Sequence, residues 1–149
     1  MTVHSPDGIG ARRAGDLARE QLAKVEDLAE WCDILVAAVP GGAQTDKLVS
    51  AGLLEKLGSK GLFVNVARAS IVDEDALVEA LQSGRIAGAG LELFSAASSL
   101  PERLSGVANV LMTPHLGSAT YETRAAMADA VFENVRAAFA GQPYSDRAA

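Results

Sequence analysis

The stretch that decides the fold is "GLFVNVARASIVDEDALVEALQSG" (61–84), which predicts a buried strand followed by a capped helix. Residues 61–67 are almost continuously apolar, which is typical of a strand buried on both faces of a parallel sheet. Asp73 is placed to cap the helix, acidic residues follow it in the first turn, and Gly84 is placed to end the helix. Three apolar side chains at helical spacing form the side that we expect to be buried: Leu77, Ala80 and Leu81.

Short apolar runs and helical patterns alternate along the rest of the chain. Three further runs, each bounded by turn residues, predict strands: 33–39 ("DILVAAV"), 87–93 ("AGAGLEL") and 109–114 ("NVLMTP"). Helical patterns lie over three other segments: 25–31, 45–58 and 119–140. Ser118 or Thr120 is placed to cap the last of these helices. Because strands alternate with helices, we predict an α/β fold, namely a partial Rossmann-type doubly wound parallel sheet.

The composition is that of a soluble globular domain: of 149 residues, 49% are apolar and 21% are charged, with a net charge of −6. No apolar run approaches the roughly 18 residues of a membrane span, and the acidic balance argues against nucleic acid as a partner. No apolar signal segment opens the chain, so we expect a cytoplasmic protein. We also expect no metal-binding residues. Cys32 is the single cysteine, so we expect a small buried residue rather than a disulfide or a nucleophile.

The stretch "GIGARRAG" (8–15) comes within one residue of the G-x-G-x-x-G fingerprint of a dinucleotide-binding loop. A true loop of this kind follows a buried strand and opens a helix, whereas "MTVHSPD" before Gly8 holds at most a three-residue strand. The third glycine also comes one residue late. We therefore interpret the stretch as a polar surface loop rather than as a phosphate-binding loop.

Three polar side chains stand where open α/β sheets hold their ligands, at the C-terminal ends of predicted strands. They are Arg68, Glu92 and His115. Taken alone, Arg68 has the ordinary interpretation of a surface arginine, and His115 that of a capping or buried histidine. Their occurrence together, at successive strand ends, indicates a ligand site instead.

Four motifs together resemble the D-isomer-specific 2-hydroxyacid dehydrogenases: "VPGGAQT" (39–45), "VNVARASIVDEDALVEAL" (64–81), "GRIAGAGLELF" (84–94) and "LMTPHLGSATYETR" (111–124). The chain is most similar to the glyoxylate/hydroxypyruvate reductase branch, and the similarity covers nearly its whole length. The resemblance implies an NAD(P)-dependent oxidoreductase that acts on a small 2-keto or 2-hydroxy acid such as glyoxylate or hydroxypyruvate.

The resemblance also assigns roles to individual residues. Arg68 is expected to bind the substrate carboxylate and keto oxygen, which suits its planar, bidentate guanidinium. His115 is expected to protonate the substrate oxygen as hydride arrives, which suits a side chain that titrates near neutral pH. The residues expected to contact the cofactor form a longer set: Val39, Pro40, Thr45, Val66, Ala67, Arg68, Glu92, His115, Gly117 and Ser118.

The choice between NAD and NADP stays open in the sequence. An acidic residue that closes the second strand of such a domain would favour NAD, but here Pro6 comes before Asp7. Arg12 and Arg13 follow and are suited to a 2′-phosphate, which tilts the expectation toward NADP. The alternative is that these two arginines are an ordinary solvated basic pair.

Two features depart from the family pattern. The family's catalytic glutamate is expected five residues beyond Glu92, where this chain has Ala97, so His115 would lack the carboxylate that raises its pKa and fixes its tautomer. The chain also begins inside the nucleotide-binding domain, since "TVHS" (2–5) matches the end of that domain's second strand. We therefore expect the substrate domain, the first strand and the phosphate loop to be missing.

Residues 1–142 are expected to form the C-terminal part of an NAD(P)-binding domain, including the final helix at 119–140, with a tail at 143–149.

Three interpretations of the function stay open. The chain is an active reductase, a truncated and inactive nucleotide-binding remnant, or one piece of a split protein. A flavodoxin-like or receiver domain is a weaker alternative, because no acidic or phosphate-binding loop follows the first strand. In the strand expected at 33–39, residues 34–39 carry no charge to guard its edge, so we expect a homodimer or larger assembly. The final helix is expected to add an apolar patch: Val131, Phe132 and Phe139.

Overall fold

The computed structural model describes residues 24–95 and 99–143. The chain divides into two compact units, Met1–Pro114 and His115–Ala149. Four features singled out in the sequence lie outside the described residues: the glycine-rich stretch at 8–15, the expected strand end at 2–5, the pair Arg12 and Arg13, and Ala97.

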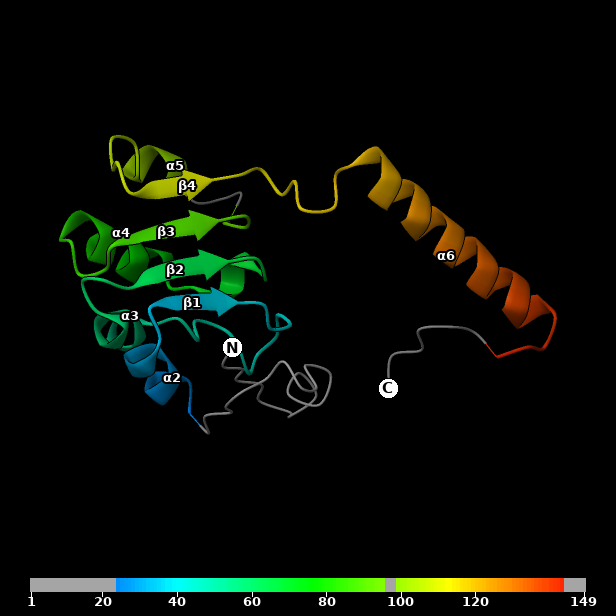
Figure 1. The fold of residues 1–149 in the computed structure, drawn as a ribbon, viewed down its shortest axis with the longest axis horizontal. Coiled ribbons are helices and arrows are strands. Elements are labelled where there is room, and N and C mark those ends of the chain that lie inside the picture. The colour runs from blue at the N-terminus through cyan, green and yellow to red at the C-terminus, as the bar shows by residue number, and fades with distance from the viewer. Residues whose placement is uncertain (1–23, 96–98, 144–149) are drawn as a thin grey trace. The chain divides into compact units, whose positions relative to one another are not determined.

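In the part of the chain that the structure describes, the first unit is built on a four-stranded parallel sheet whose spatial order, β1-β2-β3-β4, is also its chain order (Figure 1). The strands are β1 (Ile34–Ala37), β2 (Leu62–Asn65), β3 (Gly88–Leu91) and β4 (Val110–Met112). Val36, Val64, Gly90 and Leu111 align in register across the sheet. Each strand lies inside the apolar run that predicted it, and the predicted α/β class with a parallel sheet is confirmed.

Helices precede β1 and connect the strands: α2 (Val25–Trp31), α3 (Ala51–Leu57), α4 (Glu74–Gln82) and α5 (Leu100–Arg103), with the 3-10 turn η2 (Ala69–Ile71) between β2 and α4. α4 begins as predicted, because the Asp73 carboxylate accepts a hydrogen bond from the N–H of Ala76 at 3.3 Å. Gly84 follows the end of α4 with a φ of 71°. The short α5 is not predicted from the sequence.

The helix predicted over 45–58 starts later than expected. Ser50 accepts a hydrogen bond from the N–H of Leu53 at 3.4 Å, so α3 begins directly after this cap. Before the cap, Val49 forms an isolated parallel bridge with Val72. This bridge needs an extended backbone, which excludes a helix over the same residues.

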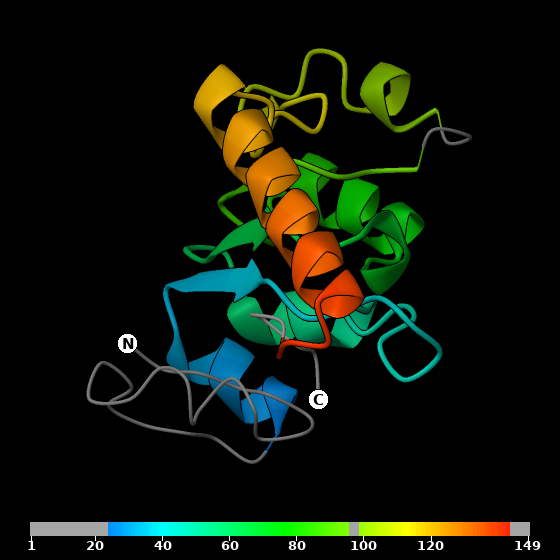
Figure 2. The same cartoon turned by 90° about the vertical axis from the view of Figure 1, so that its right-hand side faces the viewer.

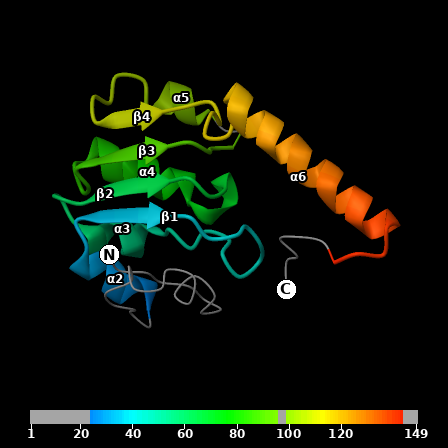
Figure 3. The same ribbon diagram turned by 45° about the vertical axis from the view of Figure 1, so that its right-hand side comes forward.

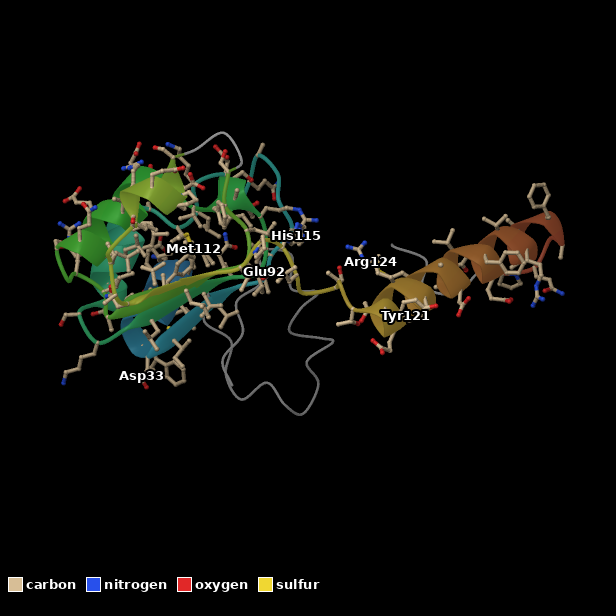
Figure 4. The ribbon with its side chains drawn as sticks, turned by 90° about the horizontal axis from the view of Figure 1, so that it is seen from above. Asp33, Glu92, Met112, His115, Tyr121 and Arg124 are labelled. Atoms are coloured by element: carbon tan, nitrogen blue, oxygen red, sulfur yellow. The ribbon has the colours of Figure 1, made fainter. Side chains whose placement is uncertain are left out.

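The helices of the first unit cover one face of its sheet (Figures 3 and 4). Leu35, Phe63 and Leu91 point toward these helices and are buried. On the opposite face, Val36 is 54% and Leu111 is 69% exposed. Right-handed crossovers that step in one direction across a parallel sheet place their helices on the same face, which explains this arrangement.

The second unit contains the long helix α6 (Tyr121–Phe139), which is seen along most of its length in Figure 2. Thr120, one of the two predicted caps, accepts a hydrogen bond from the N–H of Thr123 at 3.2 Å. Gly141 follows the helix with a φ of 65°. Several apolar side chains fall on one side of the helix at helical spacing: Ala128, Val131, Phe132, Val135 and Phe139.

Within residues 24–95 and 99–143, no helix combines the length and the apolar character that crossing a bilayer requires. The same residues contain no group of three His, Cys, Asp or Glu side chains arranged as metal ligands. Cys32 is half-buried against the core, and this burial raises the pKa of its thiol. A raised pKa disfavours the nucleophilic thiolate, as predicted, although Cys32 is less buried than the sequence indicated.

Candidate functional site

Two of the predicted site residues follow strands that are neighbours in the sheet. β2 ends at Asn65 and leads to Arg68, while β3 ends at Leu91 and leads to Glu92. Asn65 and Leu91 are partners in a parallel pair, so Arg68 and Glu92 follow the same edge of the sheet. Figure 4 shows Glu92 at this edge. Open α/β sheets bind their ligands outside the C-terminal ends of the strands, which is where this edge lies.

The Asn65 side chain is fully buried at the end of β2. Its amide nitrogen donates to the carbonyl oxygens of Arg68 at 3.0 Å and Leu93 at 3.1 Å, and its oxygen accepts from the N–H of Ala67 at 3.0 Å. The backbone carbonyl of Asn65 accepts from the N–H of Glu92 at 3.0 Å. Asn65 is not among the predicted site residues, although a polar residue inside an apolar run was a signal for it.

The "PGG" loop leaves room for the Arg68 side chain. A Cβ added to Gly41 would lie 3.0 Å from the Cγ of Arg68, which is tighter than ordinary van der Waals contact. Arg68 has an extended backbone, and its Nη1 donates to the carbonyl oxygen of Ala67 at 2.7 Å. The Arg68 side chain is otherwise exposed, so its guanidinium is accessible to a ligand. Gly41 is a second residue absent from the predicted site.

Thr45 stabilises the same loop through a hydrogen bond within it. Its buried hydroxyl donates to the carbonyl oxygen of Pro40 at 2.8 Å. Two residues later, the N–H of Lys47 donates to the carbonyl oxygen of Ser70 at 2.8 Å, which ties the loop to the segment after Arg68. Thr45 therefore holds the shape of the loop, and its predicted contact with a cofactor stays a prediction.

Glu92 is held from the neighbouring strand β4. The hydroxyl of Thr113, directly after β4, donates a hydrogen bond to the Glu92 carboxylate. The N–H of Thr113 donates to the carbonyl oxygen of Leu91 at 2.9 Å, so the hydroxyl is itself fixed by the sheet. The carboxylate thus has a defined position at the edge, where its oxygens act as hydrogen-bond acceptors.

Four more predicted residues lie around this edge in the first unit. Val39 and Pro40 follow β1, and Val66 and Ala67 follow β2. Val66 is 49% exposed, whereas Ala67 is buried. The N–H of Val66 donates to the carbonyl oxygen of Ala37 at 3.0 Å, which continues the pairing of β1 with β2 beyond the strands. The half-exposed Val66 side chain, on a backbone held by this hydrogen bond, therefore lies beside the strand-end edge that carries Arg68 and Glu92.

His115, Gly117 and Ser118 belong to the second unit, in the segment that leads to α6. His115 follows Pro114 directly and has a left-handed backbone with a φ of 57°. A non-glycine residue with a positive φ is uncommon, and such conformations cluster at functional sites. The other predicted site residues belong to the first unit, and the roles of all of them stay predictions.

A groove of about 470 Å³ lies away from the strand ends, on the exposed face of the sheet. Its walls are mainly apolar and include Leu62, Val64, Gly90 and Leu111. A Cβ on Gly90 would meet the methyl groups of Val64 at 3.7 and 3.8 Å, which is ordinary contact. The groove lacks the charged groups that the strand-end edge offers, so the edge is the better candidate for polar chemistry.

Residues 4–117 match a family model described as the D-isomer specific 2-hydroxyacid dehydrogenase, NAD binding domain. The chain is 44% identical over 127 residues to glyoxylate/hydroxypyruvate reductase A of Arabidopsis thaliana, covering 85% of this chain and 41% of that protein. It is 44% identical over 119 residues to hydroxyphenylpyruvate reductase of Plectranthus scutellarioides, covering 80% of this chain and 38% of that protein. The chain thus spans about two fifths of the length of these curated relatives.

Solved structures of similar proteins show the same fold. An NADPH-dependent glyoxylate/hydroxypyruvate reductase from Sinorhizobium meliloti, in complex with NADP and malonate, is 42% identical with a TM-score of 0.77. The match covers 91% of this chain and 45% of that chain. D-mandelate dehydrogenase of Rhodotorula graminis has a TM-score of 0.88 at 24% identity, over 99% of this chain and 43% of that chain, which shows the fold alone. The predicted Rossmann-type fold is confirmed.

Proposed function

Because the chain belongs to the D-isomer-specific 2-hydroxyacid dehydrogenase family and carries its NAD-binding domain, we propose that it serves hydride transfer between NAD(P)H and a small 2-keto acid. Glyoxylate or hydroxypyruvate is the proposed substrate, since the Arabidopsis and Sinorhizobium relatives are named for both acids. The observation that carries the proposal is the placement of Arg68 and Glu92 beyond two paired strands, at one edge of the sheet.

Arg68 is proposed to bind the substrate. Its guanidinium presents a planar fork that holds a carboxylate through parallel N–H donors, and its charge stabilises the negative charge that develops on the keto oxygen. The hydrogen bond from Nη1 to the Ala67 carbonyl and the space left by Gly41 fix the path of the side chain. A side chain with a fixed path loses less conformational entropy when it binds a ligand.

The bound nicotinamide cofactor supplies the hydride. The half-exposed Val66 fits an apolar ring at the end of β2, and the fixed Glu92 carboxylate offers hydrogen-bond acceptors beside it. NADP is proposed in preference to NAD, because the Sinorhizobium relative is NADPH-dependent and because Arg12 and Arg13 suit a 2′-phosphate. The first unit would hold the cofactor through a larger set: Val39, Pro40, Thr45, Val66, Ala67, Arg68 and Glu92.

His115 is proposed to donate the proton to the substrate oxygen, with Gly117 and Ser118 as further cofactor contacts. Histidine suits this step because its pKa lies near neutral pH. Ala97 stands where the family's glutamate is expected, so His115 would lack an orienting carboxylate. Replacing the orienting carboxylate of a serine protease costs about 10⁴-fold in rate. We therefore propose that the chain alone turns over slowly or not at all.

The exposed apolar face of the sheet favours a second candidate function. Val36 and Leu111 are more than half exposed on this face, and exposed apolar patches usually mark contact sites. As the alternative, we propose a catalytically inactive nucleotide-binding remnant or one piece of a split protein. A cytoplasmic location and a homodimer or larger assembly stay proposals under both candidates.

Two-dimensional NMR titration of the chain with malonate and with NADPH tests the proposed site. Malonate is expected to shift the resonances of Arg68 and Glu92, and Arg68→Gln is expected to abolish these shifts. Arg85→Gln is the matched control, because Arg85 precedes β3 at the opposite edge and pairs with Glu79 at 3.0 Å. NADPH is expected to bind more weakly than millimolar. Malonate shifts that survive in Arg68→Gln would contradict the proposed site.

A further inference from the structure

We infer that Asn65 is the positioning residue of the proposed substrate site, because its side chain fixes the Arg68 backbone against the end of β3. The inference rests on the proposed function, which gives Arg68 the role of binding the substrate carboxylate. Asn65 is fully buried, so it does not touch a ligand at the edge. It acts through the residue that does.

One planar amide joins two segments that follow different strands. One N–H bond reaches the carbonyl of Arg68, after β2, and another reaches the carbonyl of Leu93, after β3. The amide oxygen accepts from the N–H of Ala67, which belongs to the turn that leads to Arg68. These bonds use both N–H donors and one acceptor position of the side chain, so its orientation is determined from three directions.

The backbone of Asn65 reinforces the same connection. Its carbonyl oxygen accepts from the N–H of Glu92 at 3.0 Å, while its side chain binds the carbonyl of the next residue, Leu93. A single residue therefore links the backbone of Arg68 with that of Glu92. The separation of the two proposed ligand-binding side chains at the edge depends on Asn65.

The position of Asn65 argues against a role in stability alone. It lies on the helix-covered face of the sheet, in register with the buried Ala37 and Leu91. An apolar side chain at this position would avoid burying an amide, but it would leave the N–H of Ala67 and the carbonyls of Arg68 and Leu93 without these partners. A buried polar group is favoured there only where its hydrogen bonds are made, and the bonds of Asn65 are made to the two loops of the edge.

Asn65→Asp is the most direct variant, because it keeps the shape and the acceptor oxygen but replaces both N–H donors. We expect it to weaken malonate binding at least tenfold at a temperature where the variant is folded. The matched control is Asn109→Asp, since the Asn109 amide also donates to a backbone carbonyl, that of Ala87 at 2.6 Å, but at the opposite edge. The control is expected to bind malonate within twofold of the unmodified chain.

Asn65→Ser is a second, smaller variant, and backbone hydrogen exchange gives a measurement without ligand. We expect the amides of Ala67 and Glu92 to exchange at least tenfold faster in Asn65→Ser, and to keep their rates in Asn109→Ser. In the unmodified chain, malonate is expected to shift the Asn65 side-chain amide resonances together with those of Arg68. If malonate binds and the Asn65 side-chain amide resonances do not shift, the inference is overturned. This result is decisive even if both Asn65 variants fail to fold.

The outcomes separate this inference from the proposed function. If the unmodified chain binds no malonate but Asn65→Ser shows the local exchange, the proposed function fails and the connection made by Asn65 stands. If the chain binds malonate and the Asn65 variants bind it equally well, the proposed function stands and Asn65 has no positioning role. If the Asn65 variants have a lower free energy of unfolding but keep their affinity for malonate, Asn65 likewise has no positioning role.

Discussion

The hydroxyl of Thr113, just beyond β4, donates a hydrogen bond to the carboxylate of Glu92, just beyond β3. Thr113→Val removes the donor at similar side-chain size, and we expect it to lower the free energy of unfolding by about 1–3 kcal/mol. Thr113→Ser keeps the hydroxyl and is the matched control, with an expected change of less than about 1 kcal/mol. Urea denaturation measures both, and equal stability of the two variants would show that this bond is unimportant.

Gly41→Ala tests the space occupied by Arg68. The added Cβ would lie 3.0 Å from the Arg68 Cγ, so the arginine side chain must move by a few tenths of an ångström. We expect NMR titration to show weaker malonate binding. Gly52→Ala, within α3, is the control, because its nearest neighbour is the Ser50 hydroxyl at 4.0 Å. It should stabilise the chain by roughly 0.5–1 kcal/mol and leave binding unchanged. Unaltered affinity in Gly41→Ala contradicts the proposed fit.

Asp73 links α4 to the loop after the "PGG" motif. The cap bond from the N–H of Ala76 and the ion pair with Lys47 at 3.2 Å lower the pKa of its carboxyl group. Asp73→Ala is expected to cost about 1 kcal/mol at pH 7. A lowered pKa gives stability that is present above the unfolded value near 3.9 and is lost as the pH falls through the folded value.

The stability difference between the unmodified chain and Asp73→Ala should therefore shrink below about pH 4. Urea denaturation at a series of pH values measures this difference. Asp46→Ala, which removes an exposed carboxylate from the preceding loop, serves as the comparison. A difference that grows toward acidic pH would mean that the cap does not act through the ionised carboxylate.

The exposed face and edge of the sheet are expected to cause association. β1 has β2 as its only strand partner within the described residues, and Val36 is 54% exposed beside this edge. We expect light scattering during size exclusion to show a dimer or larger species at tens of micromolar. Val36→Lys should reduce association, because a charge on an edge strand opposes pairing. Ser59→Lys, which adds the same charge after α3, is the control. A monodisperse 15.4 kDa monomer from the unmodified chain contradicts this expectation.

The sequence predicted the elements that are marked by residues close together in the chain, such as apolar runs and capping residues. The strands appeared as apolar runs, and Asp73 and Thr120 cap helices where the pattern placed them. The start of α3 was predicted wrongly because it depends on the bridge between Val49 and Val72, which are far apart in the chain. Helical periodicity over 45–58 carries no information about that bridge.

The same limit applies to the candidate site. Arg68 and Glu92 were identifiable because strand ends and family motifs mark them. Asn65 was not, because its contacts with Arg68 and Leu93 appear only when β2 and β3 lie side by side. Gly41 was hidden in the same way, since its lack of a side chain matters only beside Arg68.

The rate of NADPH-dependent glyoxylate reduction tests the central claim most directly. The enzyme to be measured is a chimera in which residues 4–117 of this chain, with Ala97→Glu, replace the matching segment of the Arabidopsis reductase. We expect the chimera to be active, and we expect Arg68→Gln to lower its kcat/KM by at least about 10²-fold, which is roughly 2.7 kcal/mol of transition-state stabilisation. Arg85→Gln in the same chimera should change kcat/KM by less than about twofold, since surface substitutions away from a site have small effects. An Arg68→Gln chimera that reduces glyoxylate as fast as its parent would contradict the claim that this edge of the sheet binds the substrate.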